Sequence, residues 1–247
     1  MGQDSKIEWT DNTFNPWWGC TKVSAGCKNC YAETFANRFG VKWGDKEKRR
    51  ESSIKVWNEP IKWQRQAEKS GKRVKVFCAS MADWTDDNAP EGARDNLFEI
   101  IRNTPNLIWQ MLTKRPENMA SILPKDWGDG FRNVALGTTV ENQNAADVRI
   151  DILRNTPARW RFLSVEPMIG PVQLSGRLIR IDWVIVGGES GNGCRPFDPM
   201  WARDIRDACK ESGVEFFMKQ MGGQKKPFIS IPSDLDIKQF PIEWLDP

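Results

Sequence analysis

The sequence predicts an α/β fold in which parallel strands form a partial or complete (β/α) barrel. Seven short apolar runs alternate with segments of helical length along the 247 residues, and such alternation is typical of parallel βα units. The tetrapeptide RNTP occurs at 102–105 and again at 154–157, each time between an expected helix and an expected strand, which indicates a repeated unit. An open doubly wound sheet is the alternative fold.

No linker, low-complexity tract or change of composition divides the chain. We therefore expect one domain over 1–247, in which 41–72 is a charged insertion and 222–247 is a C-terminal wrap. Both signs of charge mix in KWGDKEKRRE at 42–51, so a solvated surface is the simplest interpretation of that stretch.

The elements follow in order from periodicity and from helix-stop glycines. An aromatic strand or extended arm at 10–18 leads into a helix at 28–39 that ends at Gly40, and Gly71 and Gly213 end two later helices. Short apolar runs give the later strands, which are 74–80, 107–113, 134–138, 160–164, 183–187 and 214–218. The later helices are 60–70, 90–103, 116–123, 142–155 and 199–212.

Three of the six cysteines lie in GCTKVSAGCKNCYAE, with the spacing C-x6-C-x2-C at Cys20, Cys27 and Cys30. Free backbone N–H groups at the start of the expected helix favour thiolates at Cys27 and Cys30. A structural zinc site needs four protein ligands, and the chain has no histidine to serve as one. Three cysteines therefore favour a [4Fe–4S] cluster with one iron left for another ligand. A zinc site and plain buried cysteines remain alternatives, and disulfides are the least favoured.

Composition limits the chemistry and the compartment. The absence of histidine excludes Ser-His-Asp and Cys-His nucleophilic catalysis. A net charge of +3 does not by itself indicate a nucleic-acid partner. No apolar run reaches membrane-spanning length, and the amino terminus lacks a signal-peptide core, so we expect a cytoplasmic protein with no membrane partner.

Polar side chains follow the expected strands at the end where functional groups of a barrel gather. As ligand-binding candidates we take Ser80, Asp83, Lys114, Arg115, Thr138, Glu141, Glu166, Gly187, Gly188 and Glu189. Each has a plainer interpretation: Ser80 is also a possible helix cap, and the GGESGNG segment at 187–193 is also a possible flexible turn. Trp17, Trp18 and Trp84 flank this end and could stack a base.

The segment WTDNTFNPWWGCTKVSAGCKNCYAE resembles the opening of a family of phage and bacterial proteins of unassigned function that carry a three-cysteine motif. That family is similar to radical S-adenosylmethionine (SAM) enzymes, and the resemblance extends over LTKRP, LSVEP and IVGGESG. It implies a radical-SAM barrel with a [4Fe–4S] cluster on Cys20, Cys27 and Cys30, whose free iron chelates SAM. An external electron donor would then drive cleavage of SAM to a 5′-deoxyadenosyl radical, which abstracts a hydrogen atom from the substrate.

The chain departs from the radical-SAM pattern at two points. The usual spacing is C-x3-C-x2-C, and Asn29 stands where an aromatic residue is common, with Tyr31 just after the motif. Lys114 or Arg115 is our candidate partner for the SAM carboxylate, and Glu189 or Asp83 for the amine or ribose hydroxyls. We take Glu189 and Cys194 as catalytic candidates, since Cys194, or otherwise Cys78, could donate a hydrogen atom to a product radical.

The substrate is the least defined feature of the sequence. Basic runs at 46–50 and at Lys225-Lys226 lie near the aromatic residues Trp43 and Phe228, a combination that favours single-stranded DNA or RNA and the modification or repair of a base. A peptide or small metabolite is the alternative substrate. The alternative to an enzyme is a non-catalytic phage protein that binds zinc or nucleic acid.

Overall fold

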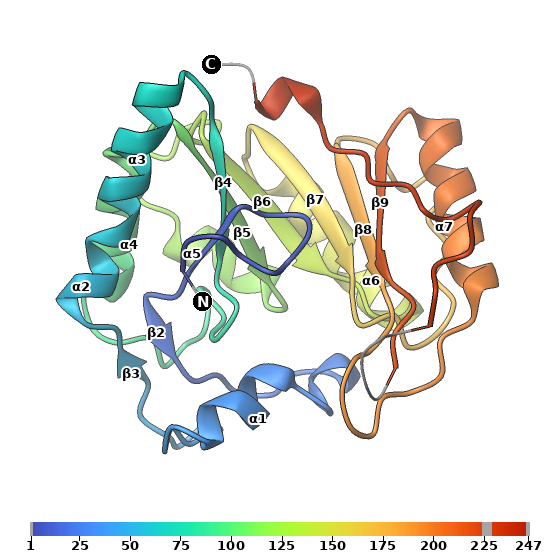
Figure 1. The fold of residues 1–247 in the computed structure, drawn as a ribbon, viewed down its shortest axis with the longest axis horizontal. Helices are drawn as coiled ribbons and strands as arrows, with labels where there is room; N and C mark the ends of the chain where they lie inside the picture. Colours follow the sequence, from blue (N-terminus) through green and yellow to red (C-terminus); the bar gives the residue numbers. More distant parts are fainter. Residues whose placement is uncertain (1, 224–228, 246–247) are drawn as a thin grey trace.

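The computed structural model describes residues 2–223 and 229–245. A sheet of seven parallel strands, in the order β1-β4-β5-β6-β7-β8-β9, curls into half a barrel (Figure 1). The order follows the chain without reversal, so the partial barrel is confirmed and the doubly wound alternative is wrong. The strands are β1 (Asn12–Phe14), β4 (Val74–Cys78), β5 (Leu107–Thr113), β6 (Val134–Thr139), β7 (Trp160–Val165), β8 (Trp183–Gly187) and β9 (Glu215–Gln220).

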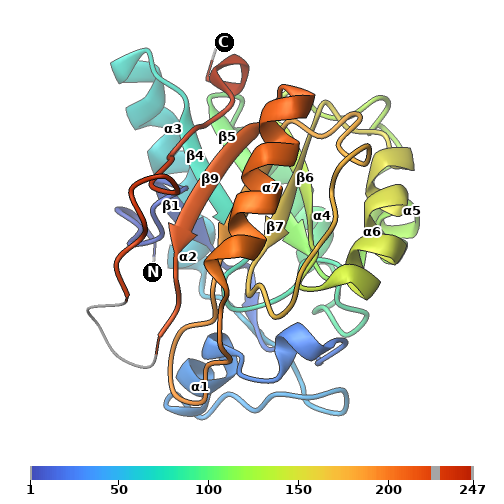
Figure 2. The ribbon, with the colours of Figure 1, turned by 90° about the vertical axis from the view of Figure 1, so that its right-hand side faces the viewer.

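Helices cover the convex face of this sheet, and Figure 2 shows α6 and α7 on that face with part of the sheet visible between them. The α-helices are α1 (Tyr31–Asn37), α2 (Ile54–Trp57), α3 (Glu59–Ser70), α4 (Ala93–Arg102), α5 (Met119–Ile122), α6 (Gln143–Asn155) and α7 (Pro199–Ser212). Short 3-10 helices are η1 (Ala25–Cys27), η2 (Pro116–Asn118) and η3 (Ile242–Trp244). No helix in the described residues is long and apolar enough to cross a membrane.

Alternation along each strand builds two cores. Val76 and Trp109 point to the convex side under the helices, whereas Phe77 and Phe162 point into the concave side. Gly137 on β6 makes room for this inner core, because a Cβ there would lie 2.4 Å from the Phe162 ring. The concave side is therefore packed with aromatic rings and is not an open channel.

Both ends of the chain contribute to the inner core. Trp9 from the N-terminal arm and Trp244 from η3 are buried against Trp183. The C-terminal segment does run over the molecule, but Trp244 is 1% exposed, so it is more than a surface wrap. Lys225, Lys226 and Phe228 lie outside the described residues.

The largest departures from expectation occur around the cysteines. The expected strand at 10–18 divides, because β2 (Trp17–Trp18) leaves the main sheet and pairs with β3 (Arg50–Glu51) in a separate two-stranded sheet. The helix expected from 28 begins at Tyr31, since η1 precedes it and Cys30 occupies the N-cap. The expected charged insertion holds α3, whose Trp63 is 1% exposed in the convex core.

Candidate functional site

A cavity of about 180 Å³ lies at the carboxyl ends of the strands. One wall is the segment 19–30, here called the cysteine loop, which with α1 runs across the lower ends of the strands in Figure 1. The opposite wall comes from the strand ends and from the inner core, with Trp9, Phe77 and Leu112 among the lining residues. The cavity therefore has an apolar floor and a polar rim, as ligand sites usually do.

Cys20, Cys27 and Cys30 all line this cavity, and each is a free, half-buried thiol. Arg115 Nη1 lies 3.7 Å from Cys20 Sγ, and Ser24 Oγ lies 3.8 Å from Cys27 Sγ. Burial, followed by the charge of Asp83, raises the pKa of Cys20 to about 12, although Arg115 acts in the opposite direction. Burial also raises the pKa of Cys30, despite hydrogen bonds from the backbone of Glu33 and Ala32. The free N–H groups expected at the helix start are present, but burial outweighs them.

The three thiols line one cavity. In residues 2–223 and 229–245, no group of three or more His, Cys, Asp or Glu side chains is arranged to hold a single metal ion. One zinc ion, with Zn–S bonds of about 2.3 Å, would need its sulfur ligands within roughly 4 Å of one another. An iron–sulfur cluster of four irons is broader than one ion and is ligated by cysteine thiolates. The donor set, three free cysteines that line one cavity, therefore fits the cluster.

Four pairs of arginine and carboxylate fasten the cysteine loop, and the first joins Arg115 to Asp83. Arg115 Nη1 donates to Asp83 Oδ2 at 3.0 Å, and Nη2 donates to the carbonyl of Thr21 at 2.6 Å. Asp83 also accepts the backbone N–H of Lys114 at 3.0 Å and of Thr85 at 3.0 Å. Both candidate SAM ligands in this pair already hold the loop beside Cys20.

The second pair is Arg49 with Asp86. Arg49 Nε donates to Asp86 Oδ2 at 2.8 Å, and Arg49 Nη2 donates to Thr21 Oγ1 at 2.7 Å. The two side chains are 0% and 1% exposed. Arg49 therefore does not belong to a solvated basic run, contrary to expectation, because its guanidinium is enclosed by the loop that it supports.

The third pair, Arg149 with Glu141, lies beneath the turn at Gly26. Arg149 Nη1 donates to Glu141 Oε2 at 2.8 Å, and the Gly26 N–H lies 3.4 Å from Glu141 Oε1. A Cβ at Gly26 would come within 3.0 Å of the Glu141 side chain. Burial raises the pKa of Glu141, but Arg149, the Ser24 hydroxyl and Lys114 more than offset burial, so the pKa lies below its usual value.

The fourth pair closes the loop from the side of the glycine-rich segment 187–195. Arg195 donates to Glu189 through Nε at 2.9 Å and through Nη2 at 2.5 Å, while Arg195 Nη1 donates to the Ala25 carbonyl at 2.9 Å. Asn29 Nδ2 donates to Glu189 Oε2 at 3.0 Å. Burial raises the pKa of Glu189, but the hydrogen bonds from Arg195 and Asn29 hold it below the usual range.

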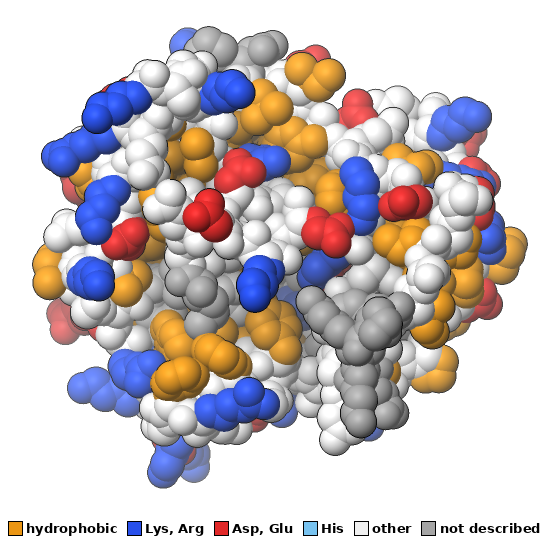
Figure 3. All heavy atoms as spheres, viewed as in Figure 1, with side chains coloured by type: hydrophobic (Ala, Val, Ile, Leu, Met, Phe, Trp, Pro, Cys, Tyr) orange, Lys and Arg blue, Asp and Glu red, His pale blue; other side chains and the backbone are white. Residues whose placement is uncertain are grey.

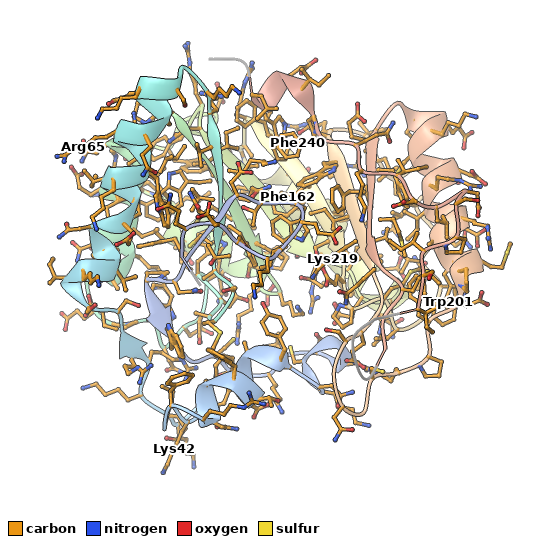
Figure 4. All side chains as sticks on the ribbon, in the orientation of Figure 1. Lys42, Arg65, Phe162, Trp201, Lys219 and Phe240 are labelled. Carbon is orange, nitrogen blue, oxygen red and sulfur yellow. The ribbon has the colours of Figure 1, made fainter. Side chains whose placement is uncertain are left out.

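Fewer polar groups of the cavity lining remain available to contact a ligand than the sequence predicts. Lys114 lines the cavity, and its Nζ donates only to Thr139 Oγ1, at 3.3 Å, within the described structure. Glu166 and Lys219 form an ion pair on the rim, and Figure 4 places Lys219 on the concave side above α1. Tyr31 also lines the cavity, and its hydroxyl donates to the Ser80 carbonyl at 3.1 Å.

The expected site residues thus fall into two groups. Ser80, Asp83, Lys114, Glu166, Gly188 and Glu189 line the cavity together with the three cysteines. Five expected residues are not part of its lining, and these are Arg115, Thr138, Glu141, Gly187 and Cys194. Thr138 is turned away because its hydroxyl donates to the Thr113 carbonyl at 3.0 Å. Trp17 and Trp84 are fully buried in the convex core, so neither can stack a base.

Sequence reasoning missed three of the four arginines that fasten the loop. Arg49, Arg149 and Arg195 carry no local motif, and each meets its carboxylate only in the folded chain. Asn29 was noted only as a departure from an aromatic position. Its bond to Glu189 explains why an amide suits this place in the chain.

Comparisons with known proteins support the fold. Residues 4–234 match a family model whose description is "Protein of unknown function (DUF5131)". The structure of spore photoproduct lyase complexed with dinucleoside spore photoproduct is similar at a TM-score of 0.54 and 13% identity, over 85% of this chain and 64% of the lyase chain. A mutant of that lyase with bound AdoMet and dinucleoside spore photoproduct is similar at a TM-score of 0.51 and 12% identity. The match covers 85% of this chain and 66% of the mutant chain. No curated protein matches the chain.

Proposed function

This chain belongs to the DUF5131 family of proteins of unknown function, and from its site we propose that it is a radical SAM-like iron–sulfur enzyme. The observation that carries the proposal is the convergence of three free thiols, Cys20, Cys27 and Cys30, on one cavity at the carboxyl ends of a parallel half-barrel. The similar lyase structure with bound AdoMet supports the same use of this fold, by analogy alone.

Cys20, Cys27 and Cys30 would hold a [4Fe–4S] cluster, and SAM would occupy the cavity beside it. With an external electron donor, these bound groups would supply a 5′-deoxyadenosyl radical that removes a hydrogen atom from the substrate. The protein's own part is to bind, orient and exclude water. Lys22 and Lys219 each form an ion pair with a glutamate, whereas Lys114 donates to the Thr139 hydroxyl, so we assign Lys114 to the SAM carboxylate.

The other lining residues would exclude water and orient the ligand. Trp9, Phe77 and Leu112 keep the floor apolar and exclude water from a reactive intermediate. Glu166 and Lys219 place one carboxylate and one ammonium group on the rim, where they can orient hydroxyl or amide groups of a ligand. Asp83 and Glu189 would act through the cysteine loop, since arginines already occupy their carboxylates.

The hydrogen-donor role of Cys194 stays a prediction. Its side chain is half-buried and does not line the cavity, so donation would need the glycine-rich segment to move. If Cys194 is the donor, Cys194→Ala should stop multiple turnover while leaving a single turnover intact. Unchanged multiple turnover would remove this role.

We propose a nucleic-acid base as the substrate class. The support is the dinucleoside spore photoproduct in the structure of the similar lyase, by analogy alone. A small metabolite is the competing substrate, and product analysis with each class of candidate separates the two.

Metal analysis of anaerobically reconstituted protein tests the first step of the proposal. We expect about four irons per chain, and Cys20→Ala, Cys27→Ala or Cys30→Ala should remove most of this iron. Cys194→Ser is the matched control and should keep the iron. If the protein binds zinc stoichiometrically and takes up no iron, the proposed enzyme is wrong and the chain is a zinc-binding protein.

Formation of 5′-deoxyadenosine under reductant tests the second step. Intact SAM after prolonged reduction of a fully loaded protein would leave only a redox or binding role. Because iron content and SAM cleavage are read separately, failure of one step identifies which half of the proposal is wrong.

A further inference from the structure

A basic face surrounds the cysteine loop on the outside of the molecule. Its exposed cations lie on the loop, after α1 and around β3, and they are Lys28, Arg38, Lys42, Lys46, Lys48 and Arg50. Asp45 and Glu51 are the exposed acids of the same stretch, while Lys22 is neutralised by Glu33 at 2.6 Å. Arg49 is not part of this face, because Asp86 holds it inside. Of the expected basic run at 46–50, only the exposed residues Lys46, Lys48 and Arg50 therefore belong to this face.

Aromatic rings lie among these cations. Trp18, Phe35 and Phe39 contact one another with ring centroids 5.0 to 5.9 Å apart, and Phe39 is 55% exposed. The Arg50 guanidinium lies 4.8 Å from the centre of the Trp18 ring. Figure 3 shows the result as a hydrophobic patch over α1 with Lys and Arg side chains around it.

This face continues into the cavity. Trp43 lines the cavity and packs in the same small cluster as Trp18 and Phe35. Tyr31 also lines the cavity, yet it is 54% exposed, so it lies at the mouth. Tyr31 and Trp43 therefore connect the basic face to the cavity lining.

We propose that this basic face binds single-stranded nucleic acid and leads one base into the cavity. Lysine and arginine side chains pair with successive phosphates, and exposed rings stack on unpaired bases, which a duplex keeps inside its own stack. The inference that this face binds nucleic acid depends only on the residues of the surface. Only the identification of the bound base as a substrate rests on the proposed function.

The test is fluorescence anisotropy with a labelled single-stranded oligothymidylate and the full chain, titrated at several salt concentrations. Affinity should fall steeply with salt. Lys42→Gln, Lys48→Gln and Arg50→Gln combined should weaken binding and lower the slope of log K against log salt by about 2, since each lost phosphate contact on a single strand removes about 0.7. Phe39→Ala should weaken binding by about tenfold at an unchanged slope, because stacking releases no counterions.

The matched control removes three charges from α3 and its end, with Arg65→Gln, Lys69→Gln and Lys72→Gln combined. Arg65 lies far from Lys42, at the opposite end of the molecule in Figure 4, so this variant should bind like the parent. An equal loss in the control, binding indifferent to salt, or duplex DNA bound as tightly as the single strand would each overturn the proposal.

Parallel assays on the same preparation separate this inference from the proposed chemistry. SAM cleavage without oligonucleotide binding would overturn the nucleic-acid surface and leave the enzyme. Oligonucleotide binding that follows the variants above, with no SAM cleavage, would leave the surface and overturn the enzyme. Circular dichroism melting of each variant shows that the surface changes leave the fold intact.

Discussion

Asn29 Nδ2 donates to Glu189 Oε2 at 3.0 Å across 160 residues of sequence. This bond joins the cysteine loop, between its second and third cysteines, to the glycine-rich segment after β8. Arg195 completes the junction by donating to the same carboxylate and to the Ala25 carbonyl. The position of the loop therefore depends on the last third of the chain.

Glu189→Gln should loosen this junction. The amide keeps the shape but loses the charge that Arg195 meets, so the free energy of unfolding should fall by about 1.5–3 kcal/mol, the usual contribution of a hydrogen bond to a charged group. Reconstituted iron per chain should fall with it. Urea denaturation and metal analysis measure the two effects, and Glu243→Gln, an exposed carboxylate, is the control.

The same substitution predicts a pH dependence with a definite sign. The folded state holds the pKa of Glu189 below its usual value, so its contribution is present above the unfolded pKa of about 4.3. That contribution is lost as pH falls through the folded pKa. The stability difference between wild type and Glu189→Gln should therefore shrink below about pH 4. A difference that is constant from pH 7 to pH 3 would contradict it.

Arg49→Met should be severely destabilising. It leaves the Asp86 carboxylate, 1% exposed, without its partner, and breaking a buried pair in this way costs about 3–5 kcal/mol. Adding Asp86→Asn should recover part of the loss. The neighbouring Arg50→Gln is the control, because Arg50 is exposed and its loss should change the free energy of unfolding by less than about 0.5 kcal/mol. Equal effects of the two arginines would show that Arg49 is not a buried support.

Lys114→Gln should weaken SAM binding to the iron-loaded protein by about tenfold or more, since one charge-assisted hydrogen bond contributes about 1.5–3 kcal/mol. Iron content should not change, because Lys114 is outside the cysteine motif. Calorimetric titration with SAM gives the affinity. Lys125→Gln removes one exposed charge away from the cavity lining and should bind SAM normally. Normal SAM affinity in Lys114→Gln would reassign the carboxylate to another group.

Gly137→Ala should destabilise the half-barrel by about 1–3 kcal/mol through overpacking, because the new Cβ would lie 2.4 Å from the Phe162 ring. Phe162→Leu in the same chain should restore part of the loss by making space. Gly170→Ala is the matched control, since a Cβ at Gly170 meets nothing within 4 Å. Thermal melting of the three variants decides whether the inner core is as tightly packed as the contacts indicate.

The order of elements could be predicted because it depends on neighbours in sequence. LIWQMLT and WVIVG are too short and too apolar for surface helices, and β5 and β8 have the predicted limits. Glycine stops placed the ends of α3 and α7, where Gly71 and Gly213 adopt the left-handed conformation. The three-cysteine motif likewise needed no structure to be noticed.

Which strand-end residues face a ligand was decided only by the tertiary structure. Four charged residues follow strands as predicted, namely Asp83, Arg115, Glu141 and Glu189. Each forms an ion pair that holds the cysteine loop, so its charge is not free to meet a ligand. Asp83 and Glu141 meet arginines from other parts of the chain, and Arg195, which pairs with Glu189 in its own segment, also donates to Ala25, 170 residues earlier. Periodicity reports which face of an element is buried, because that depends on residues two to four positions apart. Periodicity does not tell which arginine pairs with which carboxylate. These pairings depend on the curvature of the sheet, because the curvature brings distant strand ends together.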